Sequence, residues 1–170
     1  IKESFRVALH QLPYQTIPHT MIKMLAIIST DRLNMFPAKH GVSSYYSPAA
    51  IMTQLTLDYN KHCKYSFGEY IQAHPDATDR NMTACTIDAI YLHLTPTNKK
   101  GGHEFMNLNT GATFNHNQCT PVPLPNLVKE CVEEMAHEQG IEKVKFTDDK
   151  GNELPPADWI AGVDYDDDNK

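Results

Sequence analysis

Nine histidines and four cysteines give this chain the side chains for metal binding or nucleophilic catalysis. The adjacent His62 and Cys63 are the best fragment of a zinc site, but structural zinc sites combine two close ligand pairs, and the chain contains no two pairs at C-x₂₋₄-C or H-x₃₋₅-H spacing. No strained glycine elbow surrounds a serine or cysteine, as a hydrolase nucleophile would require. A stand-alone metal or thiol enzyme is therefore the least favoured interpretation. Three cysteines lie among apolar or strand-forming residues, where a buried, unreactive thiol is the commoner role: Cys85, Cys119 and Cys131.

Two other motifs could hold ions. The run "DYDDD" at 164–168 could chelate a divalent cation, because clustered carboxylates suit hard ions, yet it lacks the glycine and the terminal glutamate of a calcium loop. "KKGGHE" at 99–104 lacks the strand-loop-helix setting of a phosphate-binding loop. We therefore expect a solvated acidic tail, an ordinary turn, and no cofactor in this chain.

The net charge of −6 is unevenly distributed. Residues 1–100 carry +3, residues 101–140 carry −4 and residues 141–170 carry −5, so any contact with nucleic acid should lie in the first part. Ordinary surface lysines and core tyrosines explain the same positions equally well. The candidates for phosphate contacts flank the predicted strands: Lys61, Lys64, Arg80, Lys99 and Lys100. The candidates for stacking on bases are Tyr65, Tyr70 and Tyr91.

Helices must occupy roughly the first third of the chain. Residues 1–12 place apolar side chains at helical spacing until Pro13 stops the run. A second helix should open near Pro18 and run to about Met35, because proline suits the first turn of a helix. Its apolar face comprises Met21, Met24, Leu25 and Ile28.

Two more helices are marked by their ends. Ser47-Pro48 combines an N-cap with a first-turn proline and predicts a short helix through Gln54. Another should follow Pro125 and end at Gly140, a natural C-cap. Its apolar face is predicted to comprise Leu127, Val128, Cys131 and Met135.

The middle of the chain has the composition of strands. Residues 67–74 and 83–94 are rich in Ile, Tyr and Thr, and residues 105–116 alternate apolar with polar side chains around a tight turn at 109–111. These segments predict four or five short strands, enough for a small barrel. The predicted fold class is α+β: N-terminal helices, a small β-barrel, a C-terminal helix and an extended acidic tail.

The longest apolar stretch is short and contains a lysine, so we expect no membrane span. The four cysteines are widely spaced, without a CxxC pair, which favours reduced thiols inside a cell over a disulfide framework. The chain opens on Ile1 in what looks like the middle of a helix, and we expect it to be a piece of a longer protein.

The order of four motifs resembles the stretch that follows the catalytic core of integrase in Ty1/copia-type retrotransposon polyproteins. That family typically shows a final core helix ending near Asn and Pro, a "[ST]P" helix start, an "FG" before a strand, and a glycine-aromatic hairpin. The resemblance covers about residues 1–125. The motifs here are "RLNMFP", "SPAAIM", "FGEYIQAH" and "GGHEFMNLNTGATF", with Asn34 and Pro37, Ser47-Pro48, Phe67-Gly68 and Gly102 to Phe114 at the matching positions.

The resemblance implies an SH3-like β-barrel of the retroviral-integrase type behind the last helices of a ribonuclease-H-like core. Lys or Arg often follows the hairpin turn in that family, and this chain departs from the pattern with "TFNHNQ", which weakens the case for phosphate binding by the barrel. The expected organisation is truncated core helices at 1–37, a connector with a short helix at 38–64, the barrel at 65–122, a helix at 123–140 and an acidic linker toward reverse transcriptase at 141–170.

Integrases of this family cut and join DNA with two Asp and one Glu that hold two divalent metals, Mg²⁺ or Mn²⁺. The resemblance places both Asp upstream of this chain and the catalytic Glu about two turns before Glu3, which resembles the second, non-catalytic glutamate of the same helix. A shift of one register would make Glu3 the active-site carboxylate. The chain alone should be inactive, while the parent protein would be a polynucleotidyl transferase joined to reverse transcriptase.

The implied role is to bind or position DNA and to hold integrase subunits together, in the nucleus or a virus-like particle. The alternative is an SH3-like interaction module that binds peptide or chromatin partners, since small barrels also serve that purpose.

Overall fold

A computed structural model describes residues 2–37, 39, 41–54, 60, 63–74, 86–94, 102–142 and 150–152 of the chain. Several predicted features lie outside these residues, including most of the acidic tail, His62, Cys85 and four candidate phosphate contacts: Lys61, Arg80, Lys99 and Lys100.

The described helices begin and end close to their predicted positions. Pro18 takes the N-cap position of the second helix, and the Ser47 hydroxyl accepts a hydrogen bond of 3.1 Å from the backbone N–H of Ala50, as the N-cap interpretation requires. Gln54 ends the third helix in the left-handed conformation. The helices are α1 Lys2–His10, α2 His19–Met35, α3 Pro48–Thr53 and α5 Asn126–Glu138.

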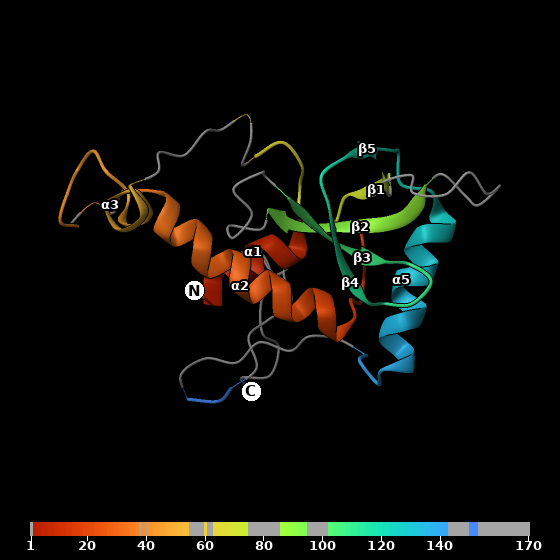
Figure 1. Ribbon diagram of the computed structural model, residues 1–170. Helices are drawn as coiled ribbons and strands as arrows, with labels where there is room; N and C mark the ends of the chain where they lie inside the picture. The colour runs from red at the N-terminus through yellow and green to blue at the C-terminus, as the bar shows by residue number, and fades with distance from the viewer. Residues whose placement is uncertain are drawn as a thin grey trace, which may run out of the picture.

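Five antiparallel strands form one open sheet in the order β4-β3-β2-β1-β5 (Figure 1). The predicted hairpin is confirmed: Phe105 of β3 pairs with Phe114 of β4, and Gly111 closes the turn with a φ of +67°. A register shift between Tyr91 and His93 bends β2. The strands are β1 Tyr70–Ala73, β2 Ile87–Leu94, β3 His103–Asn107, β4 Thr113–His116 and β5 Cys119–Pro121.

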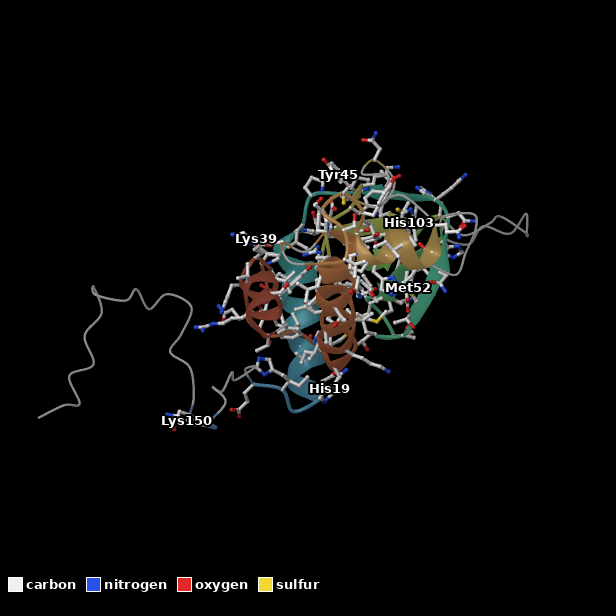
Figure 2. All side chains as sticks on the ribbon, turned by 90° about the vertical axis from the view of Figure 1, so that its left-hand side faces the viewer. His19, Lys39, Tyr45, Met52, His103 and Lys150 are labelled. Atoms are coloured by element: carbon white, nitrogen blue, oxygen red, sulfur yellow. The ribbon has the colours of Figure 1, made fainter. Side chains whose placement is uncertain are left out.

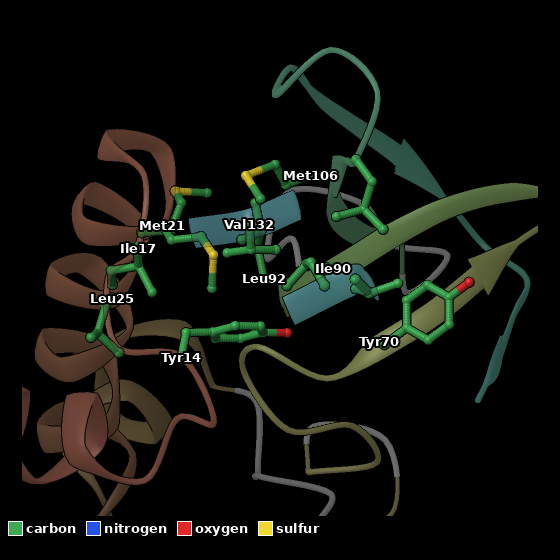
Figure 3. Close-up of a cluster of buried hydrophobic side chains, with 12 residues drawn as sticks. Tyr14, Ile17, Met21, Leu25, Tyr70, Ile90, Leu92, Met106 and Val132 are labelled. Atoms are coloured by element: carbon green, nitrogen blue, oxygen red, sulfur yellow. The ribbon is translucent and has the colours of Figure 1, made fainter. Parts of the chain in front are cut away.

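The larger hydrophobic core joins the helices to one face of the sheet. Side chains from α2 and α5 meet those of β1, β2 and β3, and Tyr14 enters from the segment before α2 (Figure 3). The four predicted core residues of α2 are all buried, and the partly buried Phe5, Ala8 and Leu9 of α1 pack against the same cluster. Its central members are Ile17, Met21, Leu25, Ile90, Leu92, Met106 and Val132.

A second, smaller core covers the opposite face of the sheet. Phe105 and Ala89 are its fully buried centre, and Phe114 of β4 and Cys119 of β5 pack against it from the two ends of the strand order. Strand alternation explains the division, because successive residues such as Tyr70 and Ile71 point to opposite faces. The sheet is therefore buried on both faces at its centre.

Gly68 ties the N-terminal segment to the sheet. Its φ is +83°, its N–H donates to the carbonyl of Tyr91 at 2.9 Å, and its own carbonyl accepts a hydrogen bond of 2.9 Å from the Tyr14 hydroxyl. A Cβ at this position would lie 2.5 Å from Cδ2 of Leu12. The turn around Gly68 also explains why β1 begins at Tyr70, later than the predicted strand start at 67.

One predicted helix face is wrong in part. The residues of α5 that are buried are Val128, Val132 and Ala136, whereas Leu127 is 76% exposed. Hydrophobicity alone placed Leu127 on the packed face, but a spacing of four residues selects the stripe from 128 to 136. The mixed helix-and-sheet class is confirmed, and the described part of the chain contains no helix long and apolar enough to cross a membrane.

Candidate nucleic-acid interface

Lys64 and Tyr65 lie together in the segment that leads into β1. The ammonium nitrogen of Lys64 stands 5.0 Å from the centroid of the Tyr65 ring, within the range of a cation–π contact. The Tyr65 hydroxyl donates to the carbonyl of Cys119 on β5 at 3.3 Å. Because the hydrogen bond to β5 fixes Tyr65, the Lys64 side chain packs against a fixed ring at the surface.

Aromatic rings on β2 and β3 pack against Tyr65. Its ring centroid lies 5.3 Å from that of Tyr91 and 5.2 Å from that of His103, the latter in an edge-on arrangement. Tyr91 continues the contact to Phe105 at 5.9 Å, and Phe105 to Phe114 at 5.6 Å. These five rings form a continuous row across β2, β3 and β4, which holds the exposed part of Tyr65 in one orientation.

The electrostatics of the pair favour a permanent positive charge at the surface. A side-chain hydrogen bond with Tyr65 raises the pKa of the fully exposed Lys64 ammonium. Burial raises the pKa of the Tyr65 hydroxyl, so this group stays neutral near pH 7. Burial, and then the charge of Lys64, lower the pKa of His103, which keeps the imidazole neutral. Lys64 is therefore the cation of this cluster.

Two partly buried thiols, Cys119 beside Tyr65 and Cys131 on α5, are poor nucleophiles. Burial raises the pKa of Cys119 and of Cys131, so both remain protonated thiols, whereas nucleophilic attack requires the thiolate. The Cys131 thiol instead donates to the carbonyl of Leu108 at 3.6 Å. Both cysteines take the unreactive role that their apolar surroundings predicted.

A polar pair on β2 and β3 is too small for metal binding. His93 Nε2 lies 3.4 Å from a carboxylate oxygen of Glu104, and both side chains are largely buried. Within the described ranges, no group of three or more His, Cys, Asp and Glu side chains could hold a metal ion. The pair therefore acts as a cross-strand contact between neighbours in the sheet.

The structure brings together only part of the predicted interface. Lys64 is exposed and Tyr65 is partly buried, whereas Tyr70 and Tyr91 are 7% and 4% exposed. The prediction that Tyr70 and Tyr91 stack on bases is therefore wrong, and the alternative that they are core tyrosines is confirmed. Each is a core residue: the Tyr70 hydroxyl donates to Asp88 at 2.8 Å, and Tyr91 lies inside the aromatic row. Glu3 lies on α1, and its side chain is outside the described set.

His103 and Phe114 belong to the cluster although the residue types alone did not single them out. The alternating pattern of the hairpin contains the relevant signal, because Phe105 pairs with Phe114 and lies two residues from His103 on the same face. The contact between His103 and Tyr65 depends on pairings across about forty residues of chain.

Comparison with known proteins returns no match, whether against family models, curated proteins or solved structures. The geometry and the motif order therefore carry the functional argument.

Proposed function

We propose that this chain is part of a copia-type retrotransposon integrase, in which an SH3-like barrel binds or positions DNA and supports integrase assembly. The phosphoryl transfer itself would belong to the absent catalytic core. The nucleus or a virus-like particle is the corresponding location.

The strand arrangement is the observation that carries the proposal. Strands β1 to β4 follow one another as a meander, and β5 returns to pair with β1 in an open sheet, an order compatible with the SH3-like barrel that the resemblance implies. Phe114 and Cys119, from the two terminal strands, contact one shared core on the same face. A shared core at both ends, together with the bend in β2, supports curling of the sheet toward closure.

The Lys64–Tyr65 pair supports the DNA-binding part. An ammonium over the face of a supported aromatic ring places a cation for a phosphate contact next to an aromatic side chain, a combination found in sequence-tolerant nucleic-acid sites. The other candidate cations, Lys61, Arg80, Lys99 and Lys100, lie outside the described residues. Their part in DNA binding is proposed from the charge pattern of the sequence alone.

The β3–β4 hairpin supports the assembly part. Strand β4 ends the sheet, and its side chains alternate between partly buried and exposed. A terminal strand can add a neighbouring chain by backbone pairing. We assign this edge to contacts with another integrase subunit.

We place the phosphoryl transfer of the parent reaction, with its two divalent metals, in a catalytic core outside this chain, as the family resemblance implies. DNA binding is therefore the activity to measure on this chain.

The decisive measurement is the salt dependence of binding to a short fluorescent DNA duplex, followed by anisotropy. Each phosphate contact contributes a slope of about −0.9 in log K against log salt concentration, so contacts from all five candidate cations would give about −4.5. Replacing Lys64 by alanine should make the slope less negative by about 0.9 and weaken binding to unrelated sequences equally.

Lys129→Ala is the matched control, because Lys129 lies on the acidic helix α5 and should leave the slope unchanged. A slope near zero, or binding to an apolar peptide that salt barely affects, would favour the interaction-module alternative. A separate test is the reading frame upstream: two aspartates and a glutamate at integrase spacing are expected there, and their absence would remove the family assignment.

A further inference from the structure

An exposed group of large apolar side chains covers the end of α2, the following segment and α3. Tyr45 is 89% exposed and Met52 is 84% exposed, and both lie with Lys39 on the side of the molecule that faces the viewer in Figure 2. The Ser43 hydroxyl accepts hydrogen bonds from the backbone N–H groups of Tyr45 at 3.1 Å and Tyr46 at 3.0 Å, which fixes the turn that presents both rings. We call this the α2–α3 surface; its large exposed apolar residues are Leu33, Phe36, Val42, Tyr45, Tyr46, Ile51 and Met52.

The composition of the α2–α3 surface is that of a protein contact. Isolated exposed apolar side chains are normal, but a group of them beside charged residues marks a binding surface. Tyrosine, phenylalanine and methionine are also enriched at protein interfaces. The exposed charges among the described residues from 30 to 54 are mainly basic, with Arg32 and Lys39 opposed by Asp31. A partner should therefore offer apolar groups that pack on aromatic rings, next to carboxylates.

The segment that leads into α5, and α5 itself, have these properties. The stretch "PVPLPNL" at 121–127 alternates exposed prolines with Val122 and Leu124, which pack against the larger core. Pro125 has a φ of −81° and a ψ of 154°, the polyproline II conformation. Leu127 follows with 76% exposure, and exposed glutamates continue from it along the same side of α5. We call this the proline–α5 ridge; its exposed residues are Pro121, Pro123, Pro125, Leu127, Glu130, Glu134 and Glu138.

The two surfaces are complementary in chemistry and in charge. Extended proline-rich segments bind surfaces lined by aromatic side chains, because the polyproline conformation is already fixed before binding and costs little entropy. The rings of Tyr45 and Tyr46 are suited to the exposed prolines, and the glutamates of α5 to Arg32 and Lys39. Like charges, in contrast, disfavour the pairing of either surface with the same surface of another copy.

The positions of the two surfaces prevent them from meeting within one molecule. Figure 1 places α3 at one end of the molecule and α5 at the other, with the sheet between them. We infer that the α2–α3 surface of one copy of this chain binds the proline–α5 ridge of a second copy. The contact is heterologous, so each added copy keeps one free surface and association continues beyond a dimer. It does not involve Lys64 or the β4 edge, so its failure would leave the proposed DNA binding untouched.

Sedimentation velocity over a dilution series of the full chain would measure the association. The average mass of the unmodified chain should rise with concentration beyond that of a dimer. Replacing Tyr45 and Met52 together by aspartate should weaken association by about tenfold or more, because tyrosines at the centre of a contact are frequent hot spots. Leu127→Asp combined with Glu134→Lys should weaken it similarly from the ridge. All four side chains are exposed, so the helical circular dichroism should stay the same.

Mixing the two double variants is the decisive experiment. Each should be monomeric alone, but one retains the proline–α5 ridge and the other retains the α2–α3 surface. An equimolar mixture should therefore form a dimer with one copy of each variant, and no larger species. Val7→Asp on α1 is the matched control, because Val7 is 58% exposed and lies outside both surfaces, and this variant should associate like the unmodified chain.

Three results would overturn the inference. An unmodified chain that stays monomeric throughout the dilution series would show that the contact does not form. Double variants that still associate would place the contact elsewhere, and the β4 edge would then remain the candidate for assembly. A mixture that stays monomeric, when each double variant alone is also monomeric, would show that like surfaces pair with each other.

Discussion

Replacing Gly68 by alanine tests how the N-terminal segment is joined to the sheet. A Cβ at this residue would lie 2.5 Å from Cδ2 of Leu12 and 3.6 Å from the ring of Tyr14. The φ of +83° also suits glycine better than any residue with a side chain. We expect the left-handed backbone to cost about 1–2 kcal/mol and the overpacking about 1–3 kcal/mol.

The expected loss for Gly68→Ala is therefore about 2–5 kcal/mol in the free energy of unfolding. Urea titration followed by far-ultraviolet circular dichroism would measure it, with the midpoint as the primary quantity. Gly140→Ala is the matched control: its φ is +72°, but no atom lies within 4 Å of the added Cβ, so only the backbone cost remains.

A double-mutant cycle separates the two contributions. Placed in a Leu12→Ala background, Gly68→Ala should cost about as much as Gly140→Ala, because the clashing methyl group is gone. The coupling energy should then equal the overpacking cost, about 1–3 kcal/mol. Equal losses for Gly68→Ala and Gly140→Ala in the unmodified chain would refute the reasoning, since Leu12 would then have rotated away without cost.

Two further changes test the core and the aromatic row. Val132→Ala should destabilise the protein by about 2 kcal/mol in urea titrations, because its side chain is fully buried between α5 and the sheet. The control Leu127→Ala should change stability by no more than about 0.5 kcal/mol. Reversed effects would mean that α5 packs the face with Leu127 against the sheet. The free energy of unfolding should fall as the pH drops from about 7.5 to 5.5. In the unfolded chain His103 binds a proton near its ordinary pKa of about 6.5, whereas burial and the charge of Lys64 lower the pKa of His103 in the folded state. His103→Phe should reduce this dependence and the exposed His19→Phe should not; an unchanged pH profile in His103→Phe would show that other groups cause it.

Local features of the sequence predicted the helices and turns well because their causes are local. Pro13 and Phe36-Pro37 end helices, Ser47 caps one, and Gly111 supplies the positive φ of the hairpin turn. Each feature acts through the backbone of a few neighbouring residues. Strand type was likewise visible in composition, although the start of β1 was not, because it depends on the turn at Gly68.

Burial of individual side chains was less predictable. Tyr65, Tyr70 and Tyr91 are equivalent by composition, yet only Tyr65 remains accessible, since the register of β1 against β2 places the other two inside the two cores. The exposed position of Leu127 also follows from the way α5 rests on the sheet. Neighbours distant in sequence decide these outcomes.

The amino-acid sequence by itself determined which segments become helix or strand, where they turn and how charge is divided along the chain, because proline, glycine, capping and periodicity act over a few residues. Only the tertiary structure decided that β5 returns beside β1, that Lys64 rests on Tyr65 and that Leu33 of α2 and Ile51 and Met52 of α3 stay exposed. These features depend on pairings across tens of residues, which local preferences do not specify.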